Sequence, residues 1–276
     1  MPPTDYEFSG PLAHAFDYLW SQFRQDYAAL AQFLNVLRVV NDAYEVQVDV
    51  AEQLLDPEST DPGDVYYKAT KLLGLDPYEV AGHTGLMMLA RGAGLYETYV
   101  ARVASQFFSD SEGIVYIGGR SWTRGDADKF FGTCLNRPMR PWRGSMKWIA
   151  QLRDLYAHGY GEPLSTESAT LLAGELWRIA RFEEAPTDEE SKIGLGEGQY
   201  LFGPHSDYSP KAGIQTLSFS TVSFALSPLT THRLLGEIES AMREVFEAAS
   251  WWTKNDLSPE NNAFLRGIEK KLTSNE

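Results

Sequence analysis

Gln151-Leu-Arg-Asp-Leu-Tyr-Ala-His-Gly-Tyr-Gly161 closes an amphipathic run that begins near Gly144. Three polar side chains lie near the end of this run: Arg153, Asp154 and His158. They combine a fixed cation, a short acid and a group that titrates near neutrality. Apolar residues recur through the run at the spacing of one helix face, at positions Met146, Ile149, Leu152, Leu155 and Tyr156. The run therefore predicts a helix, and its last polar residues are the first candidates for chemistry.

Helical spacing of apolar residues recurs along most of the chain. Val46, Val48 and Val50 alternate briefly, but the surrounding alanine and glutamine favour a continued helix. Short strands or extended loops are expected at Ile114–Ile117 and Thr216–Phe219. We therefore predict an all-α fold. The expected helices cover residues 12–55, 65–73, 77–107, 130–136, 144–158, 165–182 and 228–252.

Several helix ends are marked by capping residues. Asp64 can cap the helix that begins at Val65, and Asp76 can cap the next helix, with Pro77 at its first position. Glycines at 92 and 94 weaken the pattern within that second helix. The sequence therefore predicts either one kinked helix or two helices there.

The helical pattern also suggests how the chain is divided. Residues 1–75 are expected to form an N-terminal helical region that packs on a helical bundle of residues 76–255. Residues 256–276 are a polar tail. An acidic, glycine-rich stretch near 186–213 predicts a long loop, which is often a functional segment.

The composition of the chain limits which cellular compartment and which binding partners can be expected. The 276 residues carry a net charge of −14, which argues against non-specific binding to duplex DNA or to anionic membranes. No apolar run is long enough to span a membrane, and the N-terminus has no signal-peptide pattern. The single cysteine, Cys134, is typical of a reducing compartment. We therefore expect a cytoplasmic protein without a membrane partner.

The segment from Arg120 to Arg153 is basic within this acidic chain. Its only acidic residues are Asp126 and Asp128, so its charge is about 8 − 2 = +6. Such a segment can bind the backbone of a nucleic acid, or it can be a surface that happens to be basic. Its basic residues are Arg120, Arg124, Lys129, Arg137, Arg140, Arg143, Lys147 and Arg153.

Several common site classes have no motif in this chain. The sequence has no phosphate-binding P-loop, no dinucleotide fingerprint after a strand and no paired-cysteine zinc spacing. It also lacks His-Glu-x-x-His and a Gly-x-Ser-x-Gly elbow. We therefore predict neither a metal ion nor a cofactor.

Arg153, Asp154 and His158 suit the cleavage of RNA. A histidine can move protons between the 2′-hydroxyl and the leaving oxygen, an arginine can stabilise charge on the phosphate, and Asp154 could orient either. Residues five apart on a straight helix diverge by about 140°, so Arg153 and His158 cooperate only at a helix end or across a two-fold axis. Alternatively, Arg153 and Asp154 form surface ion pairs and His158 ends a helix near its negative pole.

The same residues resemble the signature of the HEPN superfamily. That signature is an arginine, a polar residue, three further residues and a histidine, here Arg153-Asp-Leu-Tyr-Ala-His158, followed by Gly159. The segment Gly94–Val100 resembles an upstream helix that carries a glutamate, here Glu97. Val222–Trp252 resembles the closing helix, so the resemblance covers about residues 80–252.

The resemblance implies a HEPN-like helical bundle that forms a homodimer through the motif helices. Many members are metal-independent endoribonucleases of toxin–antitoxin or antiviral defence systems. By this resemblance Arg153 and His158 are catalytic, Asp154 takes a position where asparagine is commoner, and Glu97 and Tyr156 give possible support. RNA is the expected partner, and an antitoxin or defence-system protein is a possible second one. The expected RNA-binding residues are Arg137, Arg140, Arg143, Lys147 and Trp142.

Other interpretations remain open at this point. Trp142 and Tyr156 could stack on unpaired bases, or they could be core or dimer-interface residues. Some HEPN proteins have lost activity and bind a nucleotide or a partner protein, which is the first alternative function. The second is an acidic helical scaffold that docks basic partners.

Overall fold

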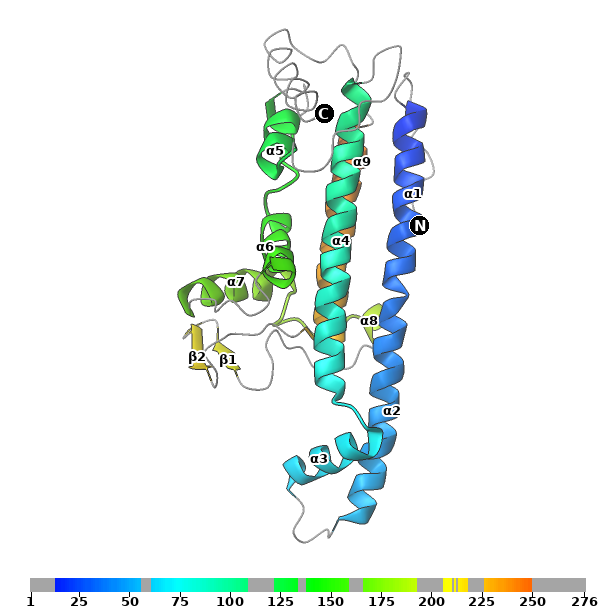
Figure 1. The fold of residues 1–276 in the computed structure, drawn as a ribbon, viewed down its shortest axis with the longest axis vertical. Coiled ribbons are helices and arrows are strands. Elements are labelled where there is room, and N and C mark those ends of the chain that lie inside the picture. Colours follow the sequence, from blue (N-terminus) through cyan, green and yellow to red (C-terminus); the bar gives the residue numbers. More distant parts are fainter. Residues whose placement is uncertain are drawn as a thin grey trace. The chain divides into compact units, whose positions relative to one another are not determined.

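The computed structural model describes residues 13–55, 61–108, 122–133, 138–158, 166–192, 206–209, 211, 213–217 and 226–249. These residues are almost entirely helical, with one small antiparallel sheet (Figure 1). The prediction of an all-α fold is confirmed. The helices are α1 (Ala13–Ala31), α2 (Phe33–Leu54), α3 (Pro62–Leu73), α4 (Pro77–Phe108), α5 (Arg124–Thr133), α6 (Ser145–His158), α7 (Thr166–Ile179), α8 (Asp188–Lys192) and α9 (Pro228–Ala249).

The predicted first helix, residues 12–55, is two helices. The interruption is Gln32, which has helical backbone angles (φ −62°, ψ −23°) and separates α1 from α2. Position 32 carries no glycine or proline, so the break has no local signal. The three alternating valines at 46, 48 and 50 all lie within α2, which confirms that the helix continues through them.

The start of α3 corrects one predicted cap. The side chain of Asp61, not that of Asp64, accepts a hydrogen bond from the Gly63 N–H (2.7 Å), and Pro62 takes the first helical position. Asp64 lies inside the first turn, where its charge favours the helix dipole. The cap predicted for α4 is confirmed, because Asp76 accepts from the Glu79 N–H (3.2 Å).

Two other helices differ from the predicted boundaries. α4 is a single helix of 32 residues that continues through both glycines, which decides between the two predicted alternatives in favour of one helix. α5 begins at Arg124 rather than at 130, because Thr123 and Asp126 cap it reciprocally. Asp126 accepts from the Thr123 N–H (3.1 Å), and Thr123 Oγ1 accepts from the Asp126 N–H (3.1 Å). Residues 134–136 lie outside the described part of the chain.

The sheet consists of β1 (Ser206–Ser209) and β2 (Gly213–Leu217), paired antiparallel from Ser206 opposite Leu217 to Ser209 opposite Gly213. The strand predicted at 216–219 overlaps β2, which begins three residues earlier, and residues 218 and 219 lie outside the described part of the chain. The stretch predicted as a loop near 186–213 holds α8 and β1. The possible strand at 114–117 lies outside the described residues.

Contacts divide the chain into two units. The first unit comprises residues 1–28, 92–147 and 237–276, and the second comprises residues 29–91 and 148–236. α1, α4, α6 and α9 each contribute residues to both. The predicted division into residues 1–75, 76–255 and 256–276 stays a prediction. Among the described helices, none combines the length and apolarity needed to cross a membrane.

The first unit is built around aromatic side chains. Trp20 of α1 stacks on Phe246 of α9, with ring centroids 4.8 Å apart. The buried Tyr96 of α4 donates a hydrogen bond to the carbonyl of Pro141 (2.7 Å). This bond fixes the connector before α6 against α4, within the same unit.

In the second unit, α2 packs against α3, and α7 packs against β2. α4 and α9 approach closely at Gly85, where a Cβ would lie 2.4 Å from Thr231 Oγ1 and 3.1 Å from Leu226 Cβ. No side chain fits in that space without a shift. The glycine therefore sets how closely these two helices pack.

Candidate functional site

Helix α6 carries the motif residues, and its sequence explains its placement. Gly144 precedes it with φ +60°, a left-handed conformation that glycine adopts readily. Ser145, its first residue, donates a hydrogen bond to Glu237 Oε2 (2.8 Å), within the first unit. One face of α6 is buried, as its spacing predicts; the buried residues are Met146, Ile149, Ala150 and Leu152.

Arg153 follows this buried face and is itself mostly covered. Its side chain is 18% exposed, and its Nη1 lies 3.2 Å from Oδ1 of Asp154, whose side chain is 40% exposed. Neighbouring residues do not face each other on a helix, so the arginine must bend its long side chain toward Asp154. The structure therefore brings together Arg153 and Asp154. The guanidinium is mostly shielded from solvent, and the carboxylate is partly exposed to it.

His158 is the last residue of α6 as described. From the sequence, Arg153 and His158 can cooperate at a helix end or across a two-fold axis, and both of these arrangements stay predictions. Position 158 is four residues after Asp154, so these two positions lie on one face of the helix. The side chain of His158 lies outside the described part, so its pairing with Arg153 stays a prediction.

Glu97 belongs to the first unit and has a partner there. Its Oε1 lies 4.0 Å from Nε of Arg124, and the Arg124 guanidinium carbon lies 4.9 Å from the ring centroid of Trp142. Glu97 and Arg124 are both partly exposed. These contacts give Glu97 a role in holding α4 against α5, while its support of catalysis stays a prediction.

Trp142 is a core residue in this structure. It is 7% exposed, and its ring meets that of Tyr96 edge to face at 5.0 Å. Its backbone N–H donates to Asp128 Oδ1 (2.8 Å). Burial raises the pKa of the Asp128 carboxyl, and the hydrogen bond from Trp142 and the charge of Arg140 partly offset that rise. The packing interpretation of Trp142 is therefore favoured over stacking on bases.

The other predicted RNA-binding residues differ in exposure. Arg140 and Arg143 lie in the connector before α6, and Lys147 lies in its first turn; all three are exposed. Arg137 lies outside the described residues, and Tyr156 is half-buried on α6. Within the first unit, the connector and the start of α6 thus offer three exposed cations.

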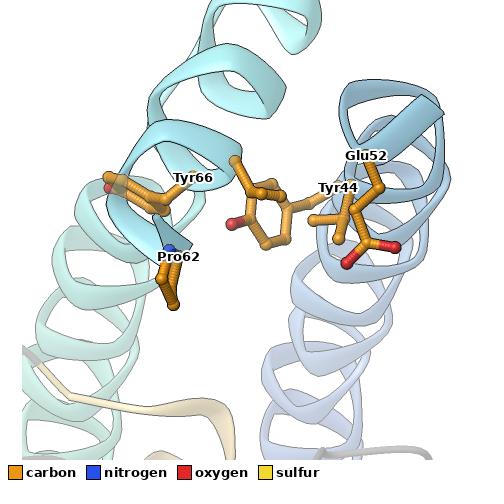
Figure 2. A pocket seen from close by; sticks show the side chains of 6 residues that line it. Tyr44, Glu52, Pro62 and Tyr66 are labelled. Carbon is orange, nitrogen blue, oxygen red and sulfur yellow. The ribbon is translucent and has the colours of Figure 1, made fainter. Parts of the chain in front are cut away.

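A shallow groove of about 370 Å³ lies between α2 and α3. Figure 2 shows Tyr44 and Glu52 entering from α2, opposite Pro62 and Tyr66 of α3. The Tyr66 hydroxyl donates to Asp76, and burial and this bond raise the pKa of Tyr66. The lining residues hold no nucleophile beside a base. The groove therefore offers aromatic and apolar surface rather than a catalytic set.

Sequence reasoning missed the most completely bonded polar cluster in the described chain, that of Arg233 on α9. Its Nε and Nη2 donate to the two carboxylate oxygens of Glu190 (2.9 and 3.1 Å). Its Nη1 and Nη2 also donate to four carbonyls in the segment after α7, those of Ala180, Arg181, Glu184 and Ala185. The ion pair holds the pKa of Glu190 at about 2.

Part of this cluster has a signal in the sequence. Thr187 and Glu190 form a capping box at the start of α8: Glu190 accepts from the Thr187 N–H (2.7 Å), and Thr187 Oγ1 accepts from the Glu190 N–H (3.3 Å). The Thr-x-x-Glu pattern could have marked this turn. The partner Arg233 is 43 residues away and has no such pattern.

No group of three or more histidine, cysteine, aspartate or glutamate side chains is placed to hold a metal ion among the described residues. Comparison with protein-family models, curated proteins and solved structures found no match for this chain. The resemblance to HEPN proteins therefore rests on the sequence alone.

Proposed function

We propose that this protein is an endoribonuclease of the HEPN type that cuts RNA without a metal ion, with Arg153 and His158 as its catalytic residues. One observation carries the proposal. Arg153 is mostly shielded from solvent beside Asp154, and His158, the last described residue of α6, follows Asp154 by four residues on the same helix. A helix end is the arrangement in which an arginine and a histidine five residues apart can act on one phosphate.

The reaction follows from the two side chains. The 2′-hydroxyl oxygen attacks the adjacent phosphorus, and its proton passes to a base. The bond from phosphorus to the 5′-oxygen breaks, and that oxygen receives a proton, leaving a 2′,3′-cyclic phosphate and a 5′-hydroxyl. His158 moves protons in this scheme, and the guanidinium of Arg153 stabilises the extra charge on the phosphate oxygens.

The environment of Arg153 supports this role. A cation that is mostly shielded from water acts on a nearby charge more strongly than an exposed one. Asp154 restrains the guanidinium, so its orientation is partly fixed before substrate arrives. Arg140, Arg143 and Lys147 would guide the RNA backbone, as exposed cations do.

The proposal includes a homodimer through α6 and a setting in bacterial defence or a toxin–antitoxin system, both by analogy with the family. In that setting a partner protein would restrain the activity. The first alternative is a non-catalytic HEPN module that binds a nucleotide or a protein through the same helix. A partly exposed Asp154 is also compatible with this alternative. The experiment must therefore distinguish binding of RNA from its cleavage.

The test compares RNA cleavage in EDTA by wild type, Arg153→Ala and His158→Ala. We expect losses of about 10²–10³-fold for Arg153→Ala and 10²–10⁴-fold for His158→Ala. Matched controls are Arg178→Ala, because Arg178 is an exposed arginine paired with Glu175 on α7, and His83→Ala, because His83 is an exposed histidine on α4. Both controls should cleave at the wild-type rate.

Each outcome has a clear meaning. Equal cleavage by all five proteins, or none by the wild type, contradicts the enzyme proposal. Binding of RNA without cleavage, lost in Arg153→Ala, favours the non-catalytic module. Recovered cleavage on mixing Arg153→Ala with His158→Ala would support a composite site across the dimer, because each partner supplies what the other lacks.

A further inference from the structure

Helix α2 exposes a line of apolar side chains, which we call the valine stripe: Val36, Val39, Val46, Val50 and Leu54. At about 100° per residue these five positions fall within an arc of about 80° and extend for about 27 Å along the helix. Each is between 36% and 61% exposed. The stripe is therefore a continuous apolar surface rather than a scatter of single residues.

The valine stripe is not the face that folds α2 into its unit. The buried residues Leu34, Leu37 and Ala51 lie more than 60° around the helix from most of it. A surface helix usually presents polar residues away from its buried face. A second apolar line, exposed along most of a 22-residue helix, is typical of an interaction surface.

The spacing of the stripe fits a second helix. Val36, Val39, Val46 and Val50 follow the alternation of three and four residues that brings side chains to the seam between two packed helices. Ala43 occupies the intervening seam position. A partner helix with the same apolar spacing would pack its side chains between these valines.

The charges beside the stripe define that partner further. Asp42 and Asp49 border one edge of it, and Glu45 and Glu52 lie behind them; all four are exposed. Arg38 is the only basic residue of α2, so its charge is 1 − 4 = −3. Two copies of this helix would bring like charges together, which disfavours self-pairing.

We infer that the valine stripe of α2 docks an amphipathic helix of a partner protein, one that carries lysine or arginine beside its apolar seam. The apolar line supplies the buried contact, and the acidic border selects the sign of the partner's charge. This inference does not depend on Arg153 or His158. It holds or fails separately from the proposed nuclease.

The test uses the full chain and two synthetic helical peptides of about three heptads. Both have the same leucine and valine seam, but one carries lysine and the other glutamate at the flanking positions. Fluorescence anisotropy should show binding of the lysine peptide only, weaker at 500 mM than at 50 mM salt. Val39→Ser and Val46→Ser should each weaken it on the order of tenfold.

The matched control is Leu171→Ser on α7, because Leu171 is exposed to a similar degree (58%) outside the stripe. It should bind as the wild type does. Asp42→Asn with Asp49→Asn should weaken lysine-peptide binding a few-fold and reduce its salt dependence. Equal binding of both peptides, no binding of either, or concentration-dependent self-association lost in Val39→Ser would overturn the inference; the last would make a second copy the occupant.

Discussion

Two arginines of the second unit, Arg233 and Arg153, show how differently the same side chain is used. The Arg233 side chain is 1% exposed and donates to both oxygens of Glu190 and to four backbone carbonyls. Arg153 is 18% exposed and lies beside Asp154, which is 40% exposed. The first guanidinium is enclosed by its own chain, and the second borders solvent.

The difference separates the structural role of Arg233 from the catalytic role proposed for Arg153. Arg233 satisfies the carbonyls of the segment that follows α7, and Glu190 compensates its charge. A substrate could reach it only by breaking these bonds. Arg153 keeps a route to solvent while its orientation is restrained, which is what a phosphate-binding arginine needs. Substitutions at the two sites should therefore change different quantities.

The largest effect is expected at the enclosed site. Arg233→Ala leaves the buried Glu190 carboxylate and several carbonyls without their donor, and should lower the free energy of unfolding by about 3–5 kcal/mol. Arg178→Ala, which breaks an exposed pair with Glu175, should change it by no more than about 0.5 kcal/mol. Urea denaturation measures both. Similar small losses in the two variants would contradict the structural role of Arg233.

Arg153→Ala should show the opposite pattern. RNA cleavage in EDTA should fall by about 10²–10³-fold, while the free energy of unfolding changes by about 1 kcal/mol or less. Arg153→Lys should recover little activity, because a lysine cannot present two parallel donors to a phosphate. Cleavage rates and urea denaturation midpoints measured on the same preparations show whether activity is lost while stability is kept. A large loss of stability with intact cleavage would place Arg153 with Arg233 as a structural arginine.

The pair of Glu190 and Arg233 also predicts an acid-dependent loss of stability. The pKa of Glu190 is about 2 in the folded chain, against 4.5 as its reference value. Its stabilisation is therefore complete above pH 4.5 and is lost as the pH falls toward 2, by an amount on the order of 2–3 kcal/mol. Thermal melts between pH 6 and pH 2 would show it. The same series in Arg233→Ala should be flatter, and an identical slope would contradict the assignment.

The sequence could predict those features that depend on local spacing. The buried face of α6 follows from Met146, Ile149 and Leu152, and the cap of α4 follows from Asp76 and Pro77. At α3 two aspartates compete, and the proline after Asp61 favours that residue over Asp64 as the cap. Gln32 is neither a glycine nor a proline and does not by itself interrupt a helix. The packing of α1 and α2 must therefore cause the break between them.

The candidate site likewise has features that the sequence could predict and features that it could not. Arg153 and Asp154 are adjacent in the sequence, so the long arginine side chain can bend back to reach the carboxylate, as an ion pair predicted from the sequence alone. The burial of Trp142 does not, because it depends on Tyr96 and Asp128, which lie on α4 and α5. Arg233 and Glu190 are 43 residues apart, and an arginine in an amphipathic helix is ordinarily a surface residue. Long-range pairs of this kind have no periodic pattern to reveal them.

The smallest effect, and the sharpest comparison, comes from making the same chemical change at both sites. Asp154→Asn and Glu190→Gln each replace a carboxylate with an amide of nearly equal size. Glu190→Gln should cost about 1.5–3 kcal/mol of stability, because buried hydrogen bonds lose their charge.

Asp154→Asn should leave stability within about 0.5 kcal/mol, because that carboxylate is half exposed. Cleavage should fall about tenfold or less, since the amide oxygen can still accept from Arg153. If Asp154→Asn abolishes cleavage with Arg153 intact, the carboxylate takes part in proton transfer rather than in orienting the arginine. Paired urea titrations and cleavage assays on the two variants decide between these roles.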